Sequence, residues 1–253
     1  MTGARAPRSD HYSYRVYADP TMAESFDDRR FSGPIGQLIA RTQEQVIAGF
    51  LDPVEGREVL DVGTGTGRAA IALAHRRARV TGIDASAEML AVAERRAREA
   101  GVDVTFLRGD AHGLGFNDRS FDTVICLRVL MHTPDWRKSV AELCRVARDR
   151  VVFDYPALFS VAALQSAARR TAYAFGAEVE AYRVFRSGAI AAALESHGFR
   201  VTGEHRQFVL PIALHKRLNS EAATGRIERA LSRAGLTRVC GSPVTVVAER
   251  CAS

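Results

Sequence analysis

Between residues 58 and 154, short apolar runs alternate with longer stretches in which apolar positions recur at helical spacing. The apolar runs predict five strands, over 58–62, 79–83, 104–107, 123–127 and 151–154. The intervening stretches predict helices over 68–77, 86–100 and about 133–147, the last capped by Thr133. Ser86 is expected to cap the second helix and Gly101 to end it. Strands that alternate with helices form a parallel sheet covered on both faces, so the pattern predicts an α/β fold.

The segments on either side of this region follow other patterns. Residues 1–13 are polar and lack periodicity, which predicts a disordered tail, and residues 14–31 predict short helical turns. Pro34 predicts the start of a helix that ends near residue 51. After the fifth strand we expect helices over about 159–175 and 188–197, a strand over about 201–209, a helix over about 221–234 and a strand over 244–248. We therefore predict a tail and helical cap (1–50) before one domain (51–253) with a helical insertion at about 156–198.

The charge of the chain is moderately basic. Its 253 residues include 35 Lys and Arg against 29 Asp and Glu, a formal net charge of +6. The arginines cluster beside glutamates in predicted helices, which favours a solvated helix face over a nucleic-acid surface. Interleaved aromatic residues of the kind that stack on bases do not accompany them. We expect no nucleic-acid partner, whereas peripheral contact with an anionic membrane is compatible with this charge.

The spacing of the cysteines and the length of the apolar runs indicate the cellular compartment of the protein. The four cysteines (Cys126, Cys144, Cys240 and Cys251) are scattered, and no two have the spacing of a metal site or redox pair. We therefore expect no metal and a reducing cytoplasm. No run of 18 uncharged apolar residues predicts a transmembrane helix, and the basic N-terminus lacks the apolar core of a secretory signal.

A glycine-rich loop follows the first predicted strand, where residues 59–68 read VLDVGTGTGR. Glycines between a strand and a helix let the backbone turn sharply and bring N–H groups close to a ligand. The dinucleotide fingerprint requires a glycine where Arg68 stands, and Asp61 would repel a diphosphate. An acidic residue there suits a ligand with an ammonium or sulfonium charge. The loop therefore predicts a nucleoside site without phosphates.

Aspartates also end the next two predicted strands. Asp84 follows the second strand, where a carboxylate can accept both hydroxyls of a ribose. Asp110 follows the third strand, where it can accept from the exocyclic amine of an adenine that packs on Ile83, Ala85 or Met89. Since the carboxyl ends of parallel strands meet at one edge of the sheet, all three aspartates are expected at the same ligand-binding edge.

The segments VLDVGTGTG, GIDAS, GDA and FDTVICLRVLMH, in this order and spacing, closely resemble small-molecule members of the class I S-adenosylmethionine-dependent methyltransferases. The resemblance is strongest over about residues 59–148. It implies a Rossmann-like three-layer α/β sandwich with a seven-stranded, mostly parallel sheet. The run 244–249 would be the last strand, inserted antiparallel.

The resemblance also implies a cofactor, S-adenosyl-L-methionine, and roles for individual residues. Asp61 and the loop would hold the methionine moiety, and Asp84 the ribose hydroxyls. Leu127 and Arg128 would lie beside the methionine part and the methyl group, and Tyr17 would close over the cofactor carboxylate. The complete set of implied cofactor-binding residues is Asp61, Gly63, Thr64, Gly65, Gly67, Asp84, Ala85, Met89, Asp110, Ala111, Leu127, Arg128 and Tyr17.

A sulfonium already makes its methyl group electrophilic, so the protein must align the reactants and exclude water. A general base helps when the acceptor arrives protonated. His132, just after the fourth strand, is the first candidate, although a histidine that packs before Pro134 is an equally good reading. Asp154 and Tyr155, at the end of the fifth strand, are second candidates for contact with the acceptor.

The sequence leaves the methyl acceptor open. The stretches 157–175 and 208–218 are apolar with basic ends, which is compatible with a helix packed on the sheet, a hydrophobic or lipid-like acceptor, or a membrane surface. Oxygen, nitrogen and carbon nucleophiles all remain compatible. The competing functions are an NAD(P)-dependent oxidoreductase, disfavoured by Arg68, and a non-catalytic module that binds the cofactor or a partner.

Overall fold

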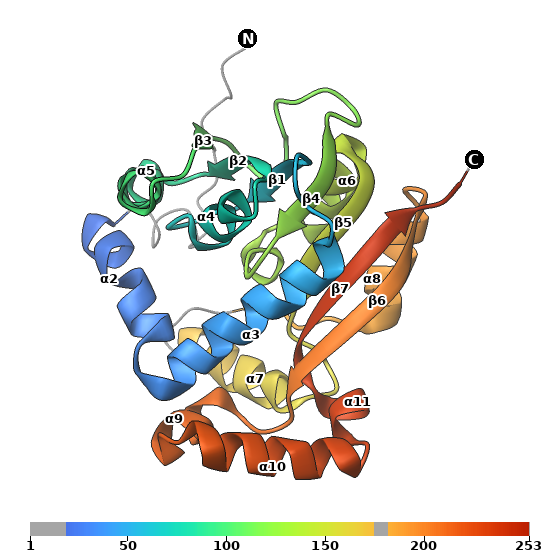
Figure 1. Cartoon of the computed structure of the whole chain (residues 1–253). Helices are drawn as coiled ribbons and strands as arrows, with labels where there is room; N and C mark the ends of the chain where they lie inside the picture. Colours follow the sequence, from blue (N-terminus) through green and yellow to red (C-terminus); the bar gives the residue numbers. More distant parts are fainter. Residues whose placement is uncertain (1–18, 175–181, 253) are drawn as a thin grey trace.

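A computed structural model describes residues 19–174 and 182–252, which form a seven-stranded sheet with helices packed around it (Figure 1). The strands are β1 (Glu58–Val62), β2 (Arg79–Asp84), β3 (Val104–Arg108), β4 (Phe121–Cys126), β5 (Ala147–Tyr155), β6 (Phe199–Phe208) and β7 (Ser242–Arg250). The helices are α2 (Pro20–Phe31), α3 (Gly33–Leu51), α4 (Arg68–His75), α5 (Ala87–Ala100), η1 (Leu130–His132), α6 (Trp136–Val146), α7 (Val161–Ala174), α8 (Ser187–Glu195), α9 (Ile212–Leu218), α10 (Glu221–Arg233) and α11 (Leu236–Cys240).

The strand order across the sheet is β3-β2-β1-β4-β5-β7-β6. Strands β1 to β5 pair in parallel, and β7 inserts between β5 and β6, antiparallel to both. The predicted Rossmann-like sheet with an antiparallel last strand is therefore confirmed. Because the chain order reverses between β1 and β4, the carboxyl ends of these strands border the crevice in which open α/β sheets bind ligands.

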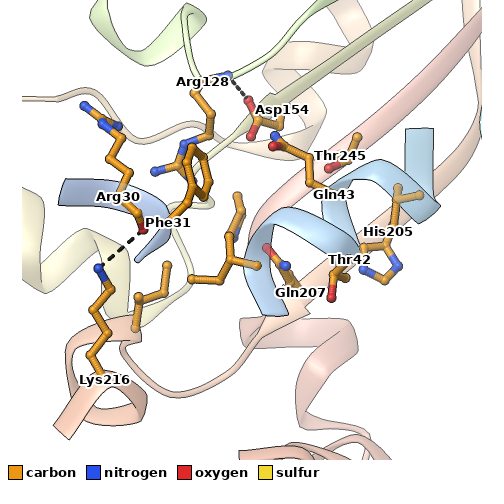
Figure 2. A pocket seen from close by; sticks show the side chains of 14 residues that line it. Arg30, Phe31, Thr42, Gln43, Arg128, Asp154, His205, Gln207, Lys216 and Thr245 are labelled. Carbon is orange, nitrogen blue, oxygen red and sulfur yellow. Dashed lines mark hydrogen bonds between the residues drawn. The ribbon is translucent and has the colours of Figure 1, made fainter. Parts of the chain in front are cut away.

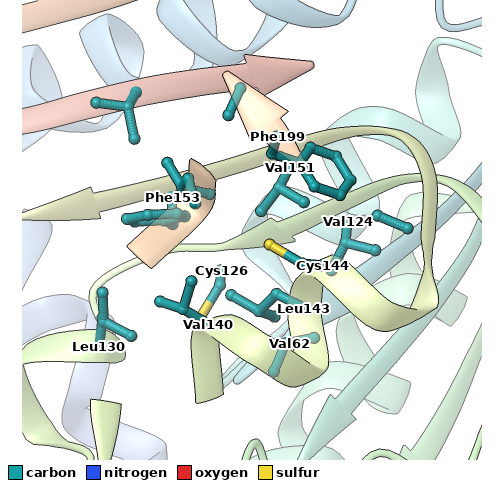
Figure 3. Packing of buried hydrophobic residues seen from close by; sticks show 14 of the residues in the cluster. Val62, Val124, Cys126, Leu130, Val140, Leu143, Cys144, Val151, Phe153 and Phe199 are labelled. Carbon is teal, nitrogen blue, oxygen red and sulfur yellow. The ribbon is translucent and has the colours of Figure 1, made fainter. Parts of the chain in front are cut away.

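Alternate residues of the central strands pack on opposite faces of the sheet. In β4, Val124 joins the apolar cluster under α6 and α8, whereas Ile125 joins the cluster under α3 and α4. Figure 3 shows the first cluster, where Val140 and Leu143 of α6 lie against side chains from β1, β4 and β5. Every residue of β4 is buried, as expected for a strand in the middle of a doubly covered sheet. This core supports the sheet edge that carries the site.

Local signals in the sequence located most helix ends correctly. The Ser86 hydroxyl accepts a hydrogen bond from the Met89 N–H at 3.0 Å, and Gly101 ends α5 with a φ of 67°. The predicted cap of α6 is wrong, because Asp135 rather than Thr133 accepts the capping bond, from the Lys138 N–H. The Thr133 hydroxyl instead donates to the Leu130 carbonyl and closes the short helix η1.

The flanking segments contain more helix than the sequence indicated. The part of residues 14–31 that the structure describes includes one continuous helix, α2, and the helices α9 and α11 were not predicted. Helix α9 falls in the apolar stretch 208–218, and α10 follows it closely (Figure 1). Of the helices in the described residues, none has an apolar stretch long enough to cross a membrane.

The burial of core side chains predicts how their truncation changes the free energy of unfolding. Leu143 is fully buried under the sheet, so Leu143→Ala should lower the free energy of unfolding by about 3 kcal/mol through lost burial and a residual cavity. Leu236→Ala is the matched control, because that side chain on α11 is 41% exposed, and it should change stability by less than about 1 kcal/mol. Urea denaturation measures both; equal losses would contradict this description of the core.

Candidate active site

The glycine loop after β1 folds tightly against the end of β2. Gly63, Gly65 and Gly67 have φ values of 72°, 55° and 80°, a region that other residues rarely adopt. A Cβ atom on Gly63 would lie 2.2 Å from Cγ2 of Val129, so the close approach of the loop after β4 also requires glycine. The N–H groups of Gly63 and Thr64 donate to the Ile83 carbonyl at 2.8 and 2.9 Å. These contacts place Gly65 at the tip of the loop, before the first turn of α4.

Asp61 lies buried beneath this loop. Its carboxylate accepts a hydrogen bond from the Thr64 hydroxyl at 2.7 Å. Burial raises the pKa of Asp61 from its ordinary value to about 6, and the nearby Asp84 carboxylate adds to this effect, whereas Thr64 and Arg68 oppose it. A carboxylate held in this way is stabilised in its charged form by a positively charged ligand group.

Asp84 connects two loops at the edge of the sheet. One carboxylate oxygen accepts the Gly65 N–H and the other accepts the Ser86 N–H, both at 2.9 Å. Burial raises the pKa of Asp84, and these hydrogen bonds partly offset that rise. These hydrogen bonds fix the carboxylate at the carboxyl ends of β1 and β2. Each of its oxygens can still accept a hydrogen bond from a ligand hydroxyl.

Asp110 is oriented by a histidine that the sequence did not single out. Its Oδ1 atom accepts the His112 N–H at 2.9 Å and lies 2.7 Å from His112 Nδ1. His112 Nε2 accepts the Asp135 N–H at 3.3 Å, so the ring proton resides on Nδ1 and points to Asp110. No local sequence pattern identifies this role, because it depends on the approach of the loop before α6.

Gly63, Asp84 and Asp110 border a cavity of about 110 Å³ at the carboxyl edge of the sheet. Six predicted site residues line it: Gly63, Asp84, Ala85, Asp110, Ala111 and His132. Ile83, Ser86, Gly109, Val129, Thr133 and Pro134 complete the lining. The cavity thus combines the Asp84 and Asp110 carboxylates with apolar side chains, a combination that suits a nucleoside. We refer to it as the nucleoside cavity.

Among the predicted cofactor residues that do not line this cavity, Met89 and Leu127 pack into apolar clusters. Met89 is buried in a small cluster with Ala23 of α2, and Leu127 packs against the apolar cluster under α3 and α4. Tyr17 lies outside the described residues. The remaining loop residue, Thr66, donates its hydroxyl to Asp27 of α2. The side chains of α2 therefore contact both the glycine loop and, through Met89, the start of α5.

Two further cavities open at the same edge of the sheet, on the other side of the loop after β4. The larger has a volume of about 740 Å³ and the smaller about 200 Å³. Six residues line both: Arg30, Arg128, Asp154, Ile212, Lys216 and Pro243. Arg128 and Asp154 meet at this junction, where the Arg128 N–H donates to the Asp154 carboxylate (Figure 2). Burial raises the pKa of Asp154, and the Arg128 guanidinium opposes that rise.

The larger cavity, which we call the acceptor cavity, is walled by helices that flank the sheet. Its apolar lining includes Met22 and Phe26 from α2, Val161 and Ala162 from α7, and Ile212 from α9. Tyr155, at the end of β5, also lines it, whereas His132 is not among its lining residues. Helices α2, α7 and α9 thus contribute side chains to one cavity.

Comparisons with known proteins agree with this geometry. A family model described as a methyltransferase domain matches residues 59–150. A ubiquinone biosynthesis O-methyltransferase of Alkalilimnicola ehrlichii is 40% identical over 103 residues, 40% of this chain and 42% of that protein. The methyltransferase GfsG of Streptomyces halstedii is 33% identical over 147 residues, 57% of this chain and 49% of that protein. The chain therefore spans less than half the length of either curated relative.

Solved structures show the same fold at low sequence identity. Magnesium protoporphyrin IX methyltransferase of Synechocystis PCC 6803, with bound S-adenosylhomocysteine, superposes with a TM-score of 0.66 at 18% identity, covering 94% of this chain and 98% of that one. The [4+2]-cyclase SpnF superposes with a TM-score of 0.68 at 18% identity, and each chain is covered completely. Residues 59–150 thus match a methyltransferase domain, and the chain has the fold of structures that bind S-adenosylmethionine or S-adenosylhomocysteine.

The position of Asp84 predicts a large effect on cofactor binding. Asp84→Ala should weaken S-adenosylhomocysteine binding by at least about 30-fold, because the ribose hydroxyls lose a charged acceptor and the Gly65 N–H loses its partner. Asp103→Ala, an exposed aspartate before β3, is the matched control and should bind normally. Isothermal titration calorimetry measures both, and an Asp84→Ala protein with unchanged affinity would refute the ribose assignment.

The raised pKa of Asp61 predicts that cofactor affinity depends on pH. A ligand ammonium group binds the ionised carboxylate, and the ionised fraction of a group with a pKa of about 6 rises about tenfold between pH 5 and pH 7. Affinity for S-adenosylhomocysteine, whose ammonium stays protonated in this range, should rise by up to that factor. Calorimetry at several pH values tests this, and Asp61→Asn should flatten the profile. If the variant keeps the wild-type slope, another group is responsible.

Proposed function

We propose that the protein transfers the methyl group of S-adenosylmethionine to a small molecule bound in the acceptor cavity, by direct in-line displacement. The observation that carries this proposal is the position of consecutive residues after β4. Val129 lines the nucleoside cavity, whereas Arg128 lines the acceptor cavity. A donor held in the first cavity and an acceptor held in the second would therefore meet across this loop.

The residues of the site fit the cofactor by their chemistry. Asp84 and Asp110 offer acceptors for ribose hydroxyls and the adenine amine, and Ala85 and Ala111 provide apolar surface between them. Asp61, buried at the loop, offers a counter-charge for the methionine ammonium. When bound, the cofactor supplies an electrophilic methyl group on a sulfonium. The protein would hold this group in line with the acceptor and keep water away from it.

The acceptor cavity favours a molecule with an apolar part. Side chains from α2, α7 and α9 provide the apolar walls. The relatives named for ubiquinone and menaquinone biosynthesis are consistent with an apolar acceptor. For acceptors that must lose a proton, Asp154 and Tyr155 lie at the cavity wall, and burial raises the pKa of the Asp154 carboxyl. His132 lines the nucleoside cavity, so its role as a base stays a prediction.

A second function uses the same cavities without methyl transfer. The cyclase SpnF shares this fold over its full length. We therefore keep as an alternative a protein that binds the cofactor but performs or assists another reaction in the acceptor cavity.

Ligand-induced stabilisation separates these functions from a dehydrogenase. S-adenosylhomocysteine at about 100 times its Kd should raise the melting temperature by about 5 °C, because it binds only the folded state, whereas NADH should not. Differential scanning fluorimetry measures this, with adenosine as a control for the nucleoside part alone. Stabilisation by NADH and not by S-adenosylhomocysteine would overturn the assignment of the nucleoside cavity.

Transfer of a labelled methyl group decides between the two functions that bind the cofactor. Incubation with methyl-labelled S-adenosylmethionine and extracts of small molecules should yield a labelled organic product for a methyltransferase. Asp84→Ala should abolish the label, which controls for contaminating enzymes. Cofactor binding without any labelled product across varied extracts would favour the alternative.

A further inference from the structure

Four cationic side chains surround the acceptor cavity. They come from separate parts of the chain: Arg30 from α2, Arg128 from the loop after β4, Arg169 from α7 and Lys216 from α9. Asp154 is the single acidic side chain among the described residues that line this cavity or the smaller one. The lining of this cavity therefore has more positive than negative side chains, which favours a negatively charged ligand.

Contacts with aromatic rings and the backbone position these cations. The Arg30 guanidinium lies 4.6 Å from the centre of the Phe26 ring, and Arg169 lies 5.7 Å from that of Tyr182. Lys216 Nζ donates to the carbonyl of Arg30 at 3.4 Å, so α9 and α2 meet at the cavity. Arg30, Arg128 and Lys216 line both cavities and therefore lie where the two join, whereas Arg169 lines the larger cavity alone.

The smaller cavity provides an independent observation. His205 Nε2 and Gln207 Nε2, both on β6, are buried and have no hydrogen-bond partner among the described residues. Both residues line this cavity together with Thr42 and Thr245. Burial lowers the pKa of His205, which keeps its ring neutral at physiological pH. Buried polar atoms without partners are destabilising, so their position indicates a ligand with hydrogen-bonding oxygen atoms.

Three of the cationic residues and the polar residues of β6 lie around the same small cavity. In Figure 2, Arg30, Arg128 and Lys216 lie to one side, and Thr42, Gln207 and His205 lie to the other. Both groups line the smaller cavity, together with the apolar side chains of Phe31, Ile39 and Val46, and the three cations also line the acceptor cavity. This pairing matches a molecule with an apolar body and an oxyanion head.

We propose that the methyl acceptor is an amphipathic organic acid. Its apolar body occupies the acceptor cavity between α2, α7 and α9. Its acidic group, a carboxylate or a phosphate, binds at the junction of the two cavities, near Arg30, Arg128 and Lys216. This substrate class rests on the proposed methyl transfer, but the binding of the acid can be tested without any methyl transfer.

Three matched probes test the preference for an acid: octanoate, octyl phosphate and octanamide. Calorimetry on the full chain, with and without S-adenosylhomocysteine, should show octanoate or octyl phosphate binding at least about tenfold more tightly than octanamide. Whichever acid binds more tightly identifies the head group as carboxylate or phosphate. Raising the salt concentration from about 0.05 M to about 0.5 M should weaken binding of the acids and not of the amide.

Variants locate the acid at the proposed junction. Lys216→Gln and Arg30→Gln should each reduce the preference for the acid by about threefold. Arg217→Gln is the matched control, since Arg217 is the next residue on α9, is exposed and lines neither cavity. Binding of S-adenosylhomocysteine to every variant confirms that each one folds.

The outcomes separate this inference from the proposed function. Equal binding of acid and amide, absence of binding by either acid, or equal effects of Arg217→Gln and Lys216→Gln would overturn the inference even if S-adenosylhomocysteine binds. Failure of S-adenosylhomocysteine to bind the wild-type protein would instead overturn the proposed function. A preference for the acids that falls by about threefold in Lys216→Gln would then still support an anion site at the junction.

Discussion

The site depends on the Asp84 carboxylate, which accepts N–H groups from two loops at once. Through Gly65 it holds the glycine loop after β1, and through Ser86 it holds the start of α5 after β2. These loops belong to adjacent parallel strands, so one side chain fixes the spacing of the two elements that border the nucleoside cavity. A half-buried carboxylate is tolerated there because hydrogen bonds satisfy both of its oxygens.

Helix α2 links this cofactor edge to the acceptor cavity. Asp27, on α2, accepts the Thr66 hydroxyl of the glycine loop and pairs with Arg96 of α5. Phe26 and Arg30 of the same helix line the acceptor cavity. Helix α2 thereby contacts the glycine loop and also lines the acceptor cavity.

Much of the cofactor half could be read from residues close together in the chain. Asp84 and Asp110 follow predicted strands, and parallel pairing alone brings their side chains to one edge. The positions of Met89 and Leu127 could not be derived in this way. Both residues stand at suitable places in the sequence. In the structure, however, Met89 packs against α2, and Leu127 packs against the apolar cluster under α3 and α4. The role of His112 likewise depends on the distant Asp135.

By itself the sequence determined the α/β order of elements, the glycine loop and the three acidic strand ends, because periodicity, backbone sterics and capping act over a few residues. Only the tertiary structure determined which side chains surround the acceptor cavity. Arg30, Arg169 and Lys216 read as ordinary helix-surface charges in the sequence, yet α2, α7 and α9 pack around one cavity. The side chains of β6 face the smaller cavity for the same reason, since β6 pairs with β7 at the sheet edge. Such convergence depends on long-range packing, which no local pattern encodes.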